Sequence, residues 1–297
     1  MSDEALQNDR QQLRRLWEQA LSEDGADRDV TSMVAVEESA IAQARLIAQQ
    51  EGVFAGQVLL DQLSEIYEGR LTLTSHVADG QAIKKADTII ATLGGPLRLL
   101  LGIERTLLNF LQRLCGVATL TRRYVDAVAG TGAKIYDTRK TIPGWRQLDK
   151  YAVRGGGGHN HRMGLHDAIL VKDNHLAGVP TARLAATACA ILCQAAGLRP
   201  PPGFIEFEVD TLDQLDELLK VVGIDVILLD NFTPAQMREA VARRDALGLK
   251  GKVQLEASGG IDLRQVRAIA ETGVERIAVG AITHSVPALD ITMDIET

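Results

Sequence analysis

Short apolar runs alternate with amphipathic stretches through the second half of the chain. Six runs with a strand-like pattern occupy residues 134–138, 168–173, 204–210, 225–230, 253–258 and 276–281. Helical patterns follow the first five runs, near residues 144–154, 181–196, 211–220, 234–246 and 262–271. This rhythm indicates a parallel sheet, and its repetition without a GxGxxG motif favours a barrel over a dinucleotide-binding fold. Because only six strands can be counted, we predict an incomplete parallel α/β barrel over residues 116–281.

The first part of the chain follows a different pattern. Helical periodicity covers residues 4–22 and 57–67, and strand-like runs cover residues 42–50, 71–76 and 87–93. This mixture predicts a smaller N-terminal α+β sandwich domain over residues 1–115, which we expect the C-terminal tail, residues 282–297, to join.

A long helical stretch connects the two predicted domains. It covers residues 96–128, with an expected break at Gly116. Polar or small residues recur along it at a spacing of three to four, which places them on one stripe of an otherwise apolar helix. The stripe consists of Arg105, Asn109, Gln112, Gly116, Thr119 and Arg123. It is either solvated surface or part of a site.

Ionisable residues mark the ends of several predicted strands. Glu206 and Glu208 alternate with apolar neighbours, so both carboxylates face the barrel interior. Lys172, Asp230 and the Glu256–Ser258 segment end their own strands, where barrel enzymes place their ligands. Buried carboxylates need a partner, so an internal ion-pair network, such as Lys172 with Glu208, is the structural alternative to a binding site.

Glycine-containing turns follow the last two strands. They are Ser258, Gly259, Gly260 and Ile261, and then Val279, Gly280, Ala281 and Ile282. Glycine lets backbone N–H groups approach a phosphate, and a following helix adds a favourable dipole. Since barrels frequently bind phosphate at their final loops, we expect a phosphate site here.

Charge is distributed unevenly along the chain. The formal net charge is −7, yet residues 137–175 hold seven Arg or Lys against four Asp and four of the six histidines. That segment is therefore +3 and the remainder −10. A cationic pocket in an acidic protein favours a small, multiply anionic substrate over a nucleic acid, and 4% aromatic residues leave little for base stacking.

No apolar run of 18 or more residues occurs, and the first fifteen residues are polar. We therefore expect a cytoplasmic protein without a membrane segment or secretory signal. Cys115, Cys189 and Cys193 form no CxxC motif, so we expect buried free thiols.

Two other interpretations remain open at this point. His159, His161, His166 and His175, with Asp167, offer zinc ligands, although HxH beside an arginine is a weak metal motif. A barrel that binds without catalysis is the second, but it does not explain why carboxylates and a lysine gather at the strand ends.

Several motifs, in order along the whole chain, resemble those of the quinolinate phosphoribosyltransferase family. They are RTLLNFLQ (105–112), DTRKTIPG (137–144), GGGHNHR (156–162), KDNH (172–175), EVD (208–210), LDN (229–231), SGG (258–260) and VGA (279–281). The chain departs from the family pattern at Gly155, where Cys or Thr is expected, and at Trp145, which is bulkier than usual.

The resemblance implies that quinolinate and 5-phosphoribosyl pyrophosphate react with Mg²⁺ to give nicotinate mononucleotide, pyrophosphate and carbon dioxide. It implies that Arg139, Arg162 and His161 clamp quinolinate and that Arg105 of a neighbouring subunit completes the clamp. Arginine suits this role because its planar fork binds carboxylates bidentately. Lys140 and Lys172, with Thr138 beside them, would contact carboxylate or pyrophosphate oxygens. The two glycine turns, Ser258–Gly259–Gly260 and Val279–Gly280–Ala281, would hold the 5-phosphate.

The same resemblance assigns catalysis to Glu208, Asp230, Lys140 and Lys172. A carboxylate can stabilise the oxocarbenium-like charge that develops on the ribose, and Glu208 and Asp230 are also the expected Mg²⁺ ligands. The family pattern implies a homodimer or an oligomer built from dimers. A sister phosphoribosyltransferase that acts on another pyridine acid is the closest rival, because a barrel does not fix the substrate.

Overall fold

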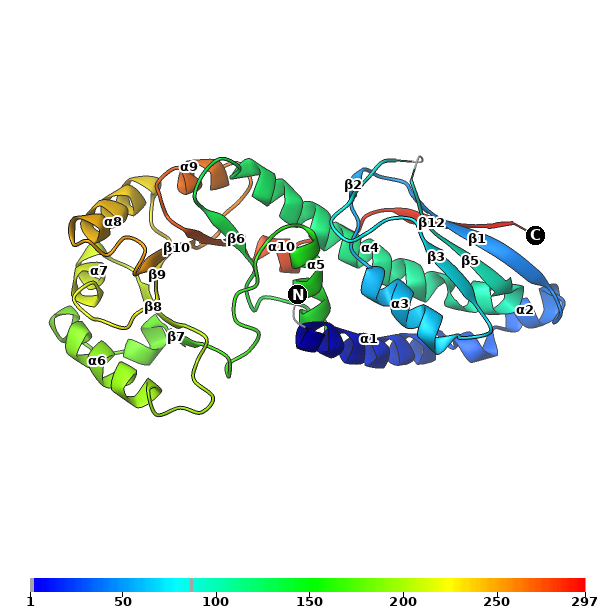
Figure 1. The fold of residues 1–297 in the computed structure, drawn as a ribbon, viewed down its shortest axis with the longest axis horizontal. Helices are drawn as coiled ribbons and strands as arrows, with labels where there is room; N and C mark the ends of the chain where they lie inside the picture. Colours follow the sequence, from blue (N-terminus) through cyan, green and yellow to red (C-terminus); the bar gives the residue numbers. More distant parts are fainter. Residues whose placement is uncertain (1–2, 86–87, 297) are drawn as a thin grey trace. The chain divides into compact units, whose positions relative to one another are not determined.

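The computed structural model describes residues 3–85 and 88–296, and the chain divides into two compact units (Figure 1). The first comprises Met1–Arg122, Thr141–Gly157 and Ile282–Thr297, and the second Arg123–Lys140 and Gly158–Ala281. The first unit therefore extends beyond the boundary expected after residue 115 and includes residues 141–157. Helix α5 (Arg146–Gly155) lies in that segment and packs against α1 (Asp3–Asp24), which explains its membership.

The first unit is built on a four-stranded antiparallel sheet. Its strand order is β12 (Ile291–Glu296), β1 (Ile41–Ala48), β5 (Ile89–Pro96) and β3 (Thr72–Ser75). The C-terminal strand β12 pairs along β1, with Met293 opposite Leu46. Alternate residues of β1, such as Leu46, are fully buried, as expected for a sheet with one covered face.

Helices complete the first unit. α3 (Gln57–Ile66) packs against β3 and α1, and the short strands β2 (Gly52–Val53) and β4 (Ala82–Ile83) pair with each other. A 3₁₀ turn (Ala26–Arg28) and α2 (Val30–Ala35) follow α1, and Asp29 caps α2 by accepting bonds from two backbone N–H groups. The predicted strand at 87–93 is observed from Ile89, and its first residue, Asp87, lies outside the described residues.

The long helix α4 (Leu97–Ala127) is continuous, so the predicted break at Gly116 is wrong. A Cβ atom at Gly116 would lie 2.3 Å from the backbone oxygen of Pro287. The glycine therefore serves the close approach of the C-terminal segment to the helix.

The second unit is an open parallel α/β barrel of six strands. Their order is β6 (Lys134–Tyr136), β11 (Arg276–Ala278), β10 (Gln254–Ser258), β9 (Val226–Asp230), β8 (Ile205–Val209) and β7 (Ile169–Val171). The helices α6 (Leu184–Ala195), α7 (Leu212–Leu218), α8 (Pro234–Ala246) and α9 (Val266–Ala270) surround the curved sheet (Figure 1). Short 3₁₀ turns (Asp173–Leu176 and Thr181–Arg183) follow β7, and α10 (Ala281–His284) follows β11. The predicted incomplete barrel with a smaller α+β domain is confirmed.

The strands of the second unit end close to the last residue of each apolar run in the sequence. Thr211 and Thr233 begin α7 and α8 with capping boxes, and Pro234 takes the first helical position. Apolar side chains such as Phe207 and Leu229 are fully buried.

Every helix among the described residues is too short or too polar to span a membrane. Cys115 is buried as expected, but Cys189 and Cys193 are exposed, because the apolar stretch that holds them is an outer helix.

Candidate active site

A cavity of about 640 Å³ lies within the second unit at the carboxyl ends of its strands. Most of the residues singled out from the sequence line it. The lining consists of Thr138, Arg139, Lys140, His161, Arg162, Leu170, Lys172, Glu208, Leu228, Asp230, Asn231, Glu256, Ser258, Gly259, Gly260 and Ala278. Residues that lie far apart in the chain thus converge on one concave surface, as expected for a ligand site.

A buried carboxylate, Asp137, organises the cationic wall of this cavity. Its oxygens accept bonds from the backbone N–H of His161 at 2.8 Å and from the side-chain amide of Asn160 at 2.6 Å. The hydroxyl of Thr138 accepts the backbone N–H of Lys140 at 3.0 Å. Sequence reasoning did not single out Asp137, although an acidic residue that ends a short strand beside a basic run was a signal.

The positive charges of Arg139 and Arg162, the two arginines of the predicted clamp, repel each other. Burial, reinforced by the charge of Arg139, lowers the pKa of the Arg162 guanidinium. Arg162 also donates to the backbone oxygen of Ala168 at 3.3 Å, which limits its freedom. An anion placed between two guanidinium groups relieves their repulsion, so this wall favours a carboxylate ligand.

Lys172 and Glu208 form an ion pair in the cavity wall. The Glu208 side chain is almost buried, whereas that of Lys172 is 43% exposed. The internal pair considered as the structural alternative is therefore present. Both residues nevertheless line the cavity, so the pair occupies the ligand surface rather than a closed core.

The first glycine turn lies in the cavity with its backbone in the left-handed region. Gly259 has φ of 104° and Gly260 has φ of 59°, values that favour glycine. The following helix, α9, has five residues and begins only at Val266. The expected contribution of a helix dipole is therefore wrong here, and the turn offers backbone N–H groups alone.

The remaining predicted residues lie elsewhere. The cavity reaches β11 at Ala278, and Val279, Gly280 and Ala281 follow just beyond the lining. Val279 is buried and its N–H donates to the backbone oxygen of Tyr136 at 2.9 Å. Arg105 belongs to α4 of the first unit and is exposed.

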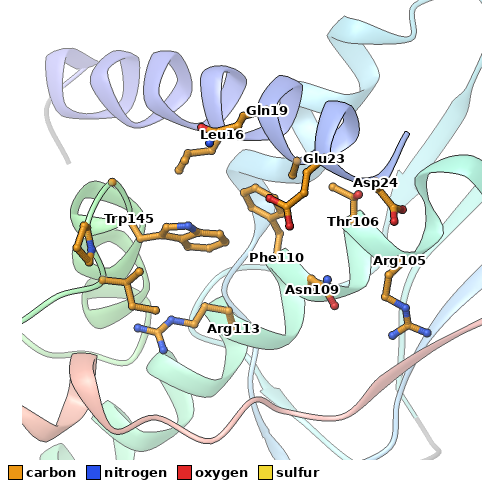
Figure 2. Close-up of a pocket in the computed structure, with 14 residues that line it drawn as sticks. Leu16, Gln19, Glu23, Asp24, Arg105, Thr106, Asn109, Phe110, Arg113 and Trp145 are labelled. Carbon is orange, nitrogen blue, oxygen red and sulfur yellow. The ribbon is translucent and has the colours of Figure 1, made fainter. Parts of the chain in front are cut away.

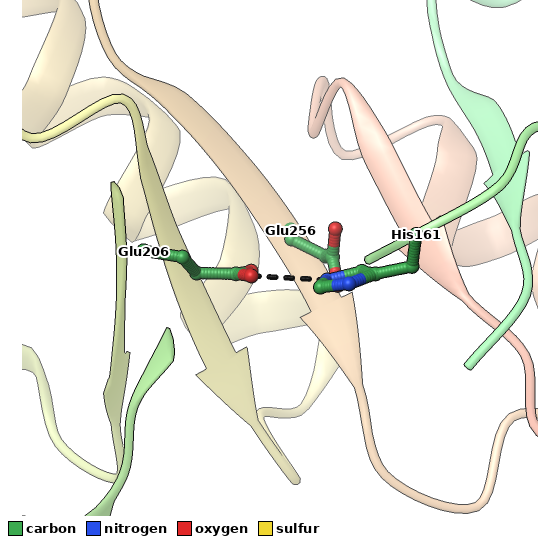
Figure 3. Close-up of side chains that lie close together, drawn as sticks. All are labelled: His161, Glu206 and Glu256. Atoms are coloured by element: carbon green, nitrogen blue, oxygen red, sulfur yellow. Dashed lines mark ion pairs between the residues drawn. The ribbon is translucent and has the colours of Figure 1, made fainter. Parts of the chain in front are cut away.

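His161 forms a buried cluster with Glu206 and Glu256 (Figure 3), and two of the three residues, His161 and Glu256, also line the cavity. Its Nε2 atom lies 2.9 Å from Glu206 Oε2 and 3.3 Å from Glu256 Oε1. Its Nδ1 atom accepts the backbone N–H of Arg162 at 2.8 Å. Both ring nitrogens are thus engaged within the protein, which orients the Arg162 backbone next to the ligand wall.

Arg276 balances the cluster from the other side. Its Nε atom donates to Glu256 at 2.5 Å, and its guanidinium lies 4.0 Å from the centre of the Tyr136 ring. Sequence reasoning missed Arg276, although a charged residue that opens an apolar strand near the core is itself a signal of pairing.

The carboxylates and the histidine shift one another's proton affinity. Burial alone would lower the pKa of His161, but Glu206 and Glu256 outweigh it and raise that pKa to about 9. Burial and the charge of Glu256 raise the pKa of Glu206 above its ordinary value. Burial also opposes ionisation of Glu256, yet His161 and Arg276 lower its pKa overall. The cluster therefore retains a proton shared between His161 and Glu206 at neutral pH.

His161, Glu206 and Glu256 lie close enough together to ligate a metal, but their chemistry does not fit one. Nε2 faces both carboxylates, which hold a proton on it and raise the pKa of His161 to about 9, so this atom offers no lone pair to a metal at neutral pH. Arg276 beside Glu256 would also repel a cation. Within the described residues, His159, His166 and His175 join no group of metal ligands, so the zinc interpretation has no support here.

Glu208 and Asp230 are two carboxylates of the cavity that could hold a magnesium ion. Glu208 is the penultimate residue of β8 and Asp230 is the last residue of the adjacent parallel strand β9, and both line the cavity. Carboxylate oxygens are the ligands that Mg²⁺ prefers, usually one or two from the protein with phosphate oxygens and water completing the shell.

A second cavity, of about 590 Å³, lies within the first unit and includes Arg105 (Figure 2). The rings of Phe110 and Trp145 form one wall, with centroids 4.7 Å apart. Arg113 beside them is held by three hydrogen bonds to Asp149 and one to the backbone oxygen of Thr283. Arg105, in contrast, is exposed at this cavity.

Sequence comparisons place both units in one family. The family model for the quinolinate phosphoribosyl transferase N-terminal domain matches residues 29–115, and that for its C-terminal domain matches residues 117–294. The chain belongs to the quinolinate phosphoribosyltransferase family. A probable nicotinate-nucleotide pyrophosphorylase (carboxylating) of Bacillus subtilis is 40% identical over 284 residues, which cover 96% of this chain and 93% of the relative. A nicotinate-nucleotide pyrophosphorylase (carboxylating) of Mycobacterium leprae is 43% identical over 270 residues, which cover 90% of this chain and 91% of that protein.

Solved structures of the quinolinate phosphoribosyltransferase family share the fold. The nicotinate-nucleotide pyrophosphorylase of Francisella tularensis superposes with a TM-score of 0.85 at 36% identity, over 97% of each chain. That of Ehrlichia chaffeensis gives a TM-score of 0.83 at 35% identity, over 95% of this chain and 98% of the other.

Both departures from the quinolinate phosphoribosyltransferase motifs are explained by packing in the first unit. A Cβ atom at Gly155 would lie 3.2 Å from the Cβ of Ala55, so a larger residue there requires a neighbour to move. Trp145 packs on Phe110, whose ring also contacts Trp17 of α1. Its extra bulk therefore fills an aromatic cluster beneath α1.

Proposed function

We propose that this protein transfers the phosphoribosyl group of 5-phosphoribosyl pyrophosphate to quinolinate with loss of carbon dioxide. The products are nicotinate mononucleotide and pyrophosphate, which makes the reaction a step of de novo NAD biosynthesis. The observation that carries this proposal is the shared cavity of the second unit, where four cationic side chains face two carboxylates at strand ends. They are Arg139, Lys140, Arg162, Lys172, Glu208 and Asp230.

Quinolinate binds to the arginine wall in this proposal. Arg139 and Arg162 each offer a planar fork to one carboxylate, and the repulsion between them is relieved when the dianion enters. His161 accepts the backbone N–H of Arg162 at Nδ1, so it supports the clamp by holding the Arg162 backbone rather than by binding quinolinate itself.

The phosphoribosyl donor lies across the strand ends. The Ser258–Gly259–Gly260 turn presents backbone N–H groups to the 5-phosphate, which is why glycine with positive φ is required there. We place the Val279–Gly280–Ala281 turn at the outer side of the same phosphate. Lys140 and Lys172 neutralise carboxylate or pyrophosphate oxygens as point charges.

Cleavage of the bond between C1 of the ribose and pyrophosphate leaves oxocarbenium-like charge on the sugar. Glu208 and Asp230 stabilise this charge electrostatically, because they lie on adjacent strands in the wall of one cavity. Lys172 is paired with Glu208 before the donor binds, and we infer that it turns to the pyrophosphate when the donor arrives. Glu208 and Asp230 would hold Mg²⁺, which would supply positive charge for the pyrophosphate oxygens.

Carbon dioxide is lost after the ring nitrogen of quinolinate has bonded to C1. The alkylated ring is positively charged, so it stabilises the carbanion that remains at C2 when the carboxylate departs. That carbon then takes up a proton. The protein's part in this step is to hold the ring in place through the other carboxylate.

We further propose that the active unit is a homodimer or an oligomer of dimers. Arg105 lies exposed on α4 beside an aromatic cavity of the first unit, as expected for a cation that completes a partner's site (Figure 2). We also propose a cytoplasmic location. The three cysteines are free thiols, which fits a reducing compartment.

Labelled quinolinate tests the proposed reaction. With a ¹⁴C label in the carboxylate on C2, the protein, 5-phosphoribosyl pyrophosphate and Mg²⁺ should release one labelled carbon dioxide for each nicotinate mononucleotide formed. A sample without the donor should release none. Nucleotide that retains the label, or label release that does not need the donor, would reject the proposed function.

A further inference from the structure

Asn231 follows Asp230 at the end of β9 and lines the same cavity. Its φ of 55° is in the left-handed region, and no other non-glycine residue in the described part of the chain has positive φ. Residues other than Gly, Asn and Asp rarely adopt this conformation. Such a conformation persists only where the surrounding structure holds it in place.

Three contacts hold Asn231. Its backbone N–H donates to the backbone oxygen of Ser258 at 3.0 Å, which ties the end of β9 to the end of β10. Its side-chain amide donates to Asp230 Oδ2 at 2.7 Å. Its Oδ1 atom lies 2.1 Å from the position that a Cβ of residue 259 would take, so the side chain occupies the notch that Gly259 leaves.

These contacts link Asp230 to the Gly259 turn, and the proposed function assigns both to binding of the phosphoribosyl donor. Asp230 is placed at the ribose and magnesium, and the turn that contains Gly259 is placed at the 5-phosphate. A hydrogen bond to one oxygen of Asp230 restricts rotation of the carboxylate and directs the other oxygen. The same side chain blocks movement of the turn toward β9.

We propose that Asn231 is a positioning residue for the phosphoribosyl donor, acting through Asp230 and Gly259. The inference rests on the proposed function, because the donor is the ligand that reaches both. Binding of quinolinate, which is assigned to the arginine wall, should depend little on the Asn231 side chain. Glycine should preserve the backbone at position 231 while removing the side chain, whereas aspartate should retain the shape but place a second negative charge beside Asp230.

The test compares wild type with N231G, N231D, D230N and the double variant D230N/N231G. We expect N231G to raise KM for 5-phosphoribosyl pyrophosphate about tenfold, the effect of losing one charge-assisted hydrogen bond. KM for quinolinate should change less than about twofold. N231D should bind the donor more weakly than N231G, because two carboxylates repel at that distance.

Calorimetric titration of 5-phosphoribosyl pyrophosphate with Mg²⁺ supplies the deciding readout. If Asn231 acts through Asp230, N231G should weaken donor binding much less in the D230N background than in wild type. Equal weakening in both backgrounds would show that Asn231 does not act through Asp230 and would overturn the proposal as stated. Unchanged donor affinity in N231G, with an active wild type, would also overturn the inference while leaving the proposed function intact. A wild type that neither binds nor uses the donor would overturn both.

Discussion

Replacement of Arg276 by methionine tests the account of the buried cluster. Arg276 is 6% exposed, and its Nε atom lies 2.5 Å from Glu256, which is fully buried. R276M keeps a similar length of apolar side chain but removes the guanidinium from the Glu256 carboxylate, which also lies close to His161 and Glu206. Removing one partner of a buried ion pair costs about 3–5 kcal/mol, a large part of a typical total stability of about 5–15 kcal/mol.

The double variant R276M/E256Q separates charge from packing. It lacks both charges, so we expect it to recover at least about 2 kcal/mol relative to R276M alone. R264M is the matched control, because Arg264 pairs with Asp262 on the surface of the same unit with its side chain 92% exposed. Its unfolding midpoint should equal that of wild type within error.

Urea unfolding followed by far-ultraviolet circular dichroism provides the measurement. Both tryptophans, Trp17 and Trp145, belong to the first unit, so their fluorescence reports separately on that unit. The reasoning is refuted if R276M unfolds at the same urea concentration as R264M, or if the added E256Q substitution restores no stability.

Three further predictions follow from the site. E208Q and D230N should keep the wild-type melting temperature within a few degrees. Both should lower kcat at least about tenfold, since the carboxylate charge is needed most as the ribosyl cation develops. Unchanged kcat in steady-state assays, with reduced stability, would assign both residues to a structural network. The free energy of unfolding should fall by up to about 3 kcal/mol as pH rises from about 6.5 to about 9, because the pKa of His161 is higher in the folded than in the unfolded protein. In urea titrations, H161Q should lose this dependence of stability on pH. Mixing R105A subunits with E208Q subunits should recover part of the activity if Arg105 serves a partner's site; a mixture that stays inactive after confirmed subunit exchange would assign Arg105 to its own chain.

Periodicity predicted the barrel well because each strand of the second unit is a short apolar run that ends at a polar residue. The same patterns located Lys172, Glu208 and Asp230 in one cavity, since carboxyl ends of parallel strands meet at one edge. The pattern of α4 misled at Gly116, because the reason for that glycine is the backbone of Pro287, 171 residues away in the chain. Contacts of that kind carry no local signal.

The partners of the buried charges could not be predicted for the same reason. Arg276 and Glu256 belong to different strands, and only the strand order of the folded sheet brings them together. The left-handed conformation of Asn231 depends on Gly259 of the next strand. Strand alternation did place Glu206 inside the barrel, but not its pairing with His161, which comes from a loop outside the regular repeat.

The proposed function depends most directly on the preference for a dicarboxylate. Steady-state kinetics with quinolinate and nicotinate, each with 5-phosphoribosyl pyrophosphate and Mg²⁺, measure this preference side by side. Loss of one carboxylate removes charge-assisted hydrogen bonds of about 1.5–3 kcal/mol each to the wall formed by Arg139, Lys140 and Arg162. We therefore predict that kcat/KM for quinolinate exceeds that for nicotinate by at least about tenfold and up to about a thousandfold. Comparable values for the two acids would contradict the assignment of quinolinate as the substrate.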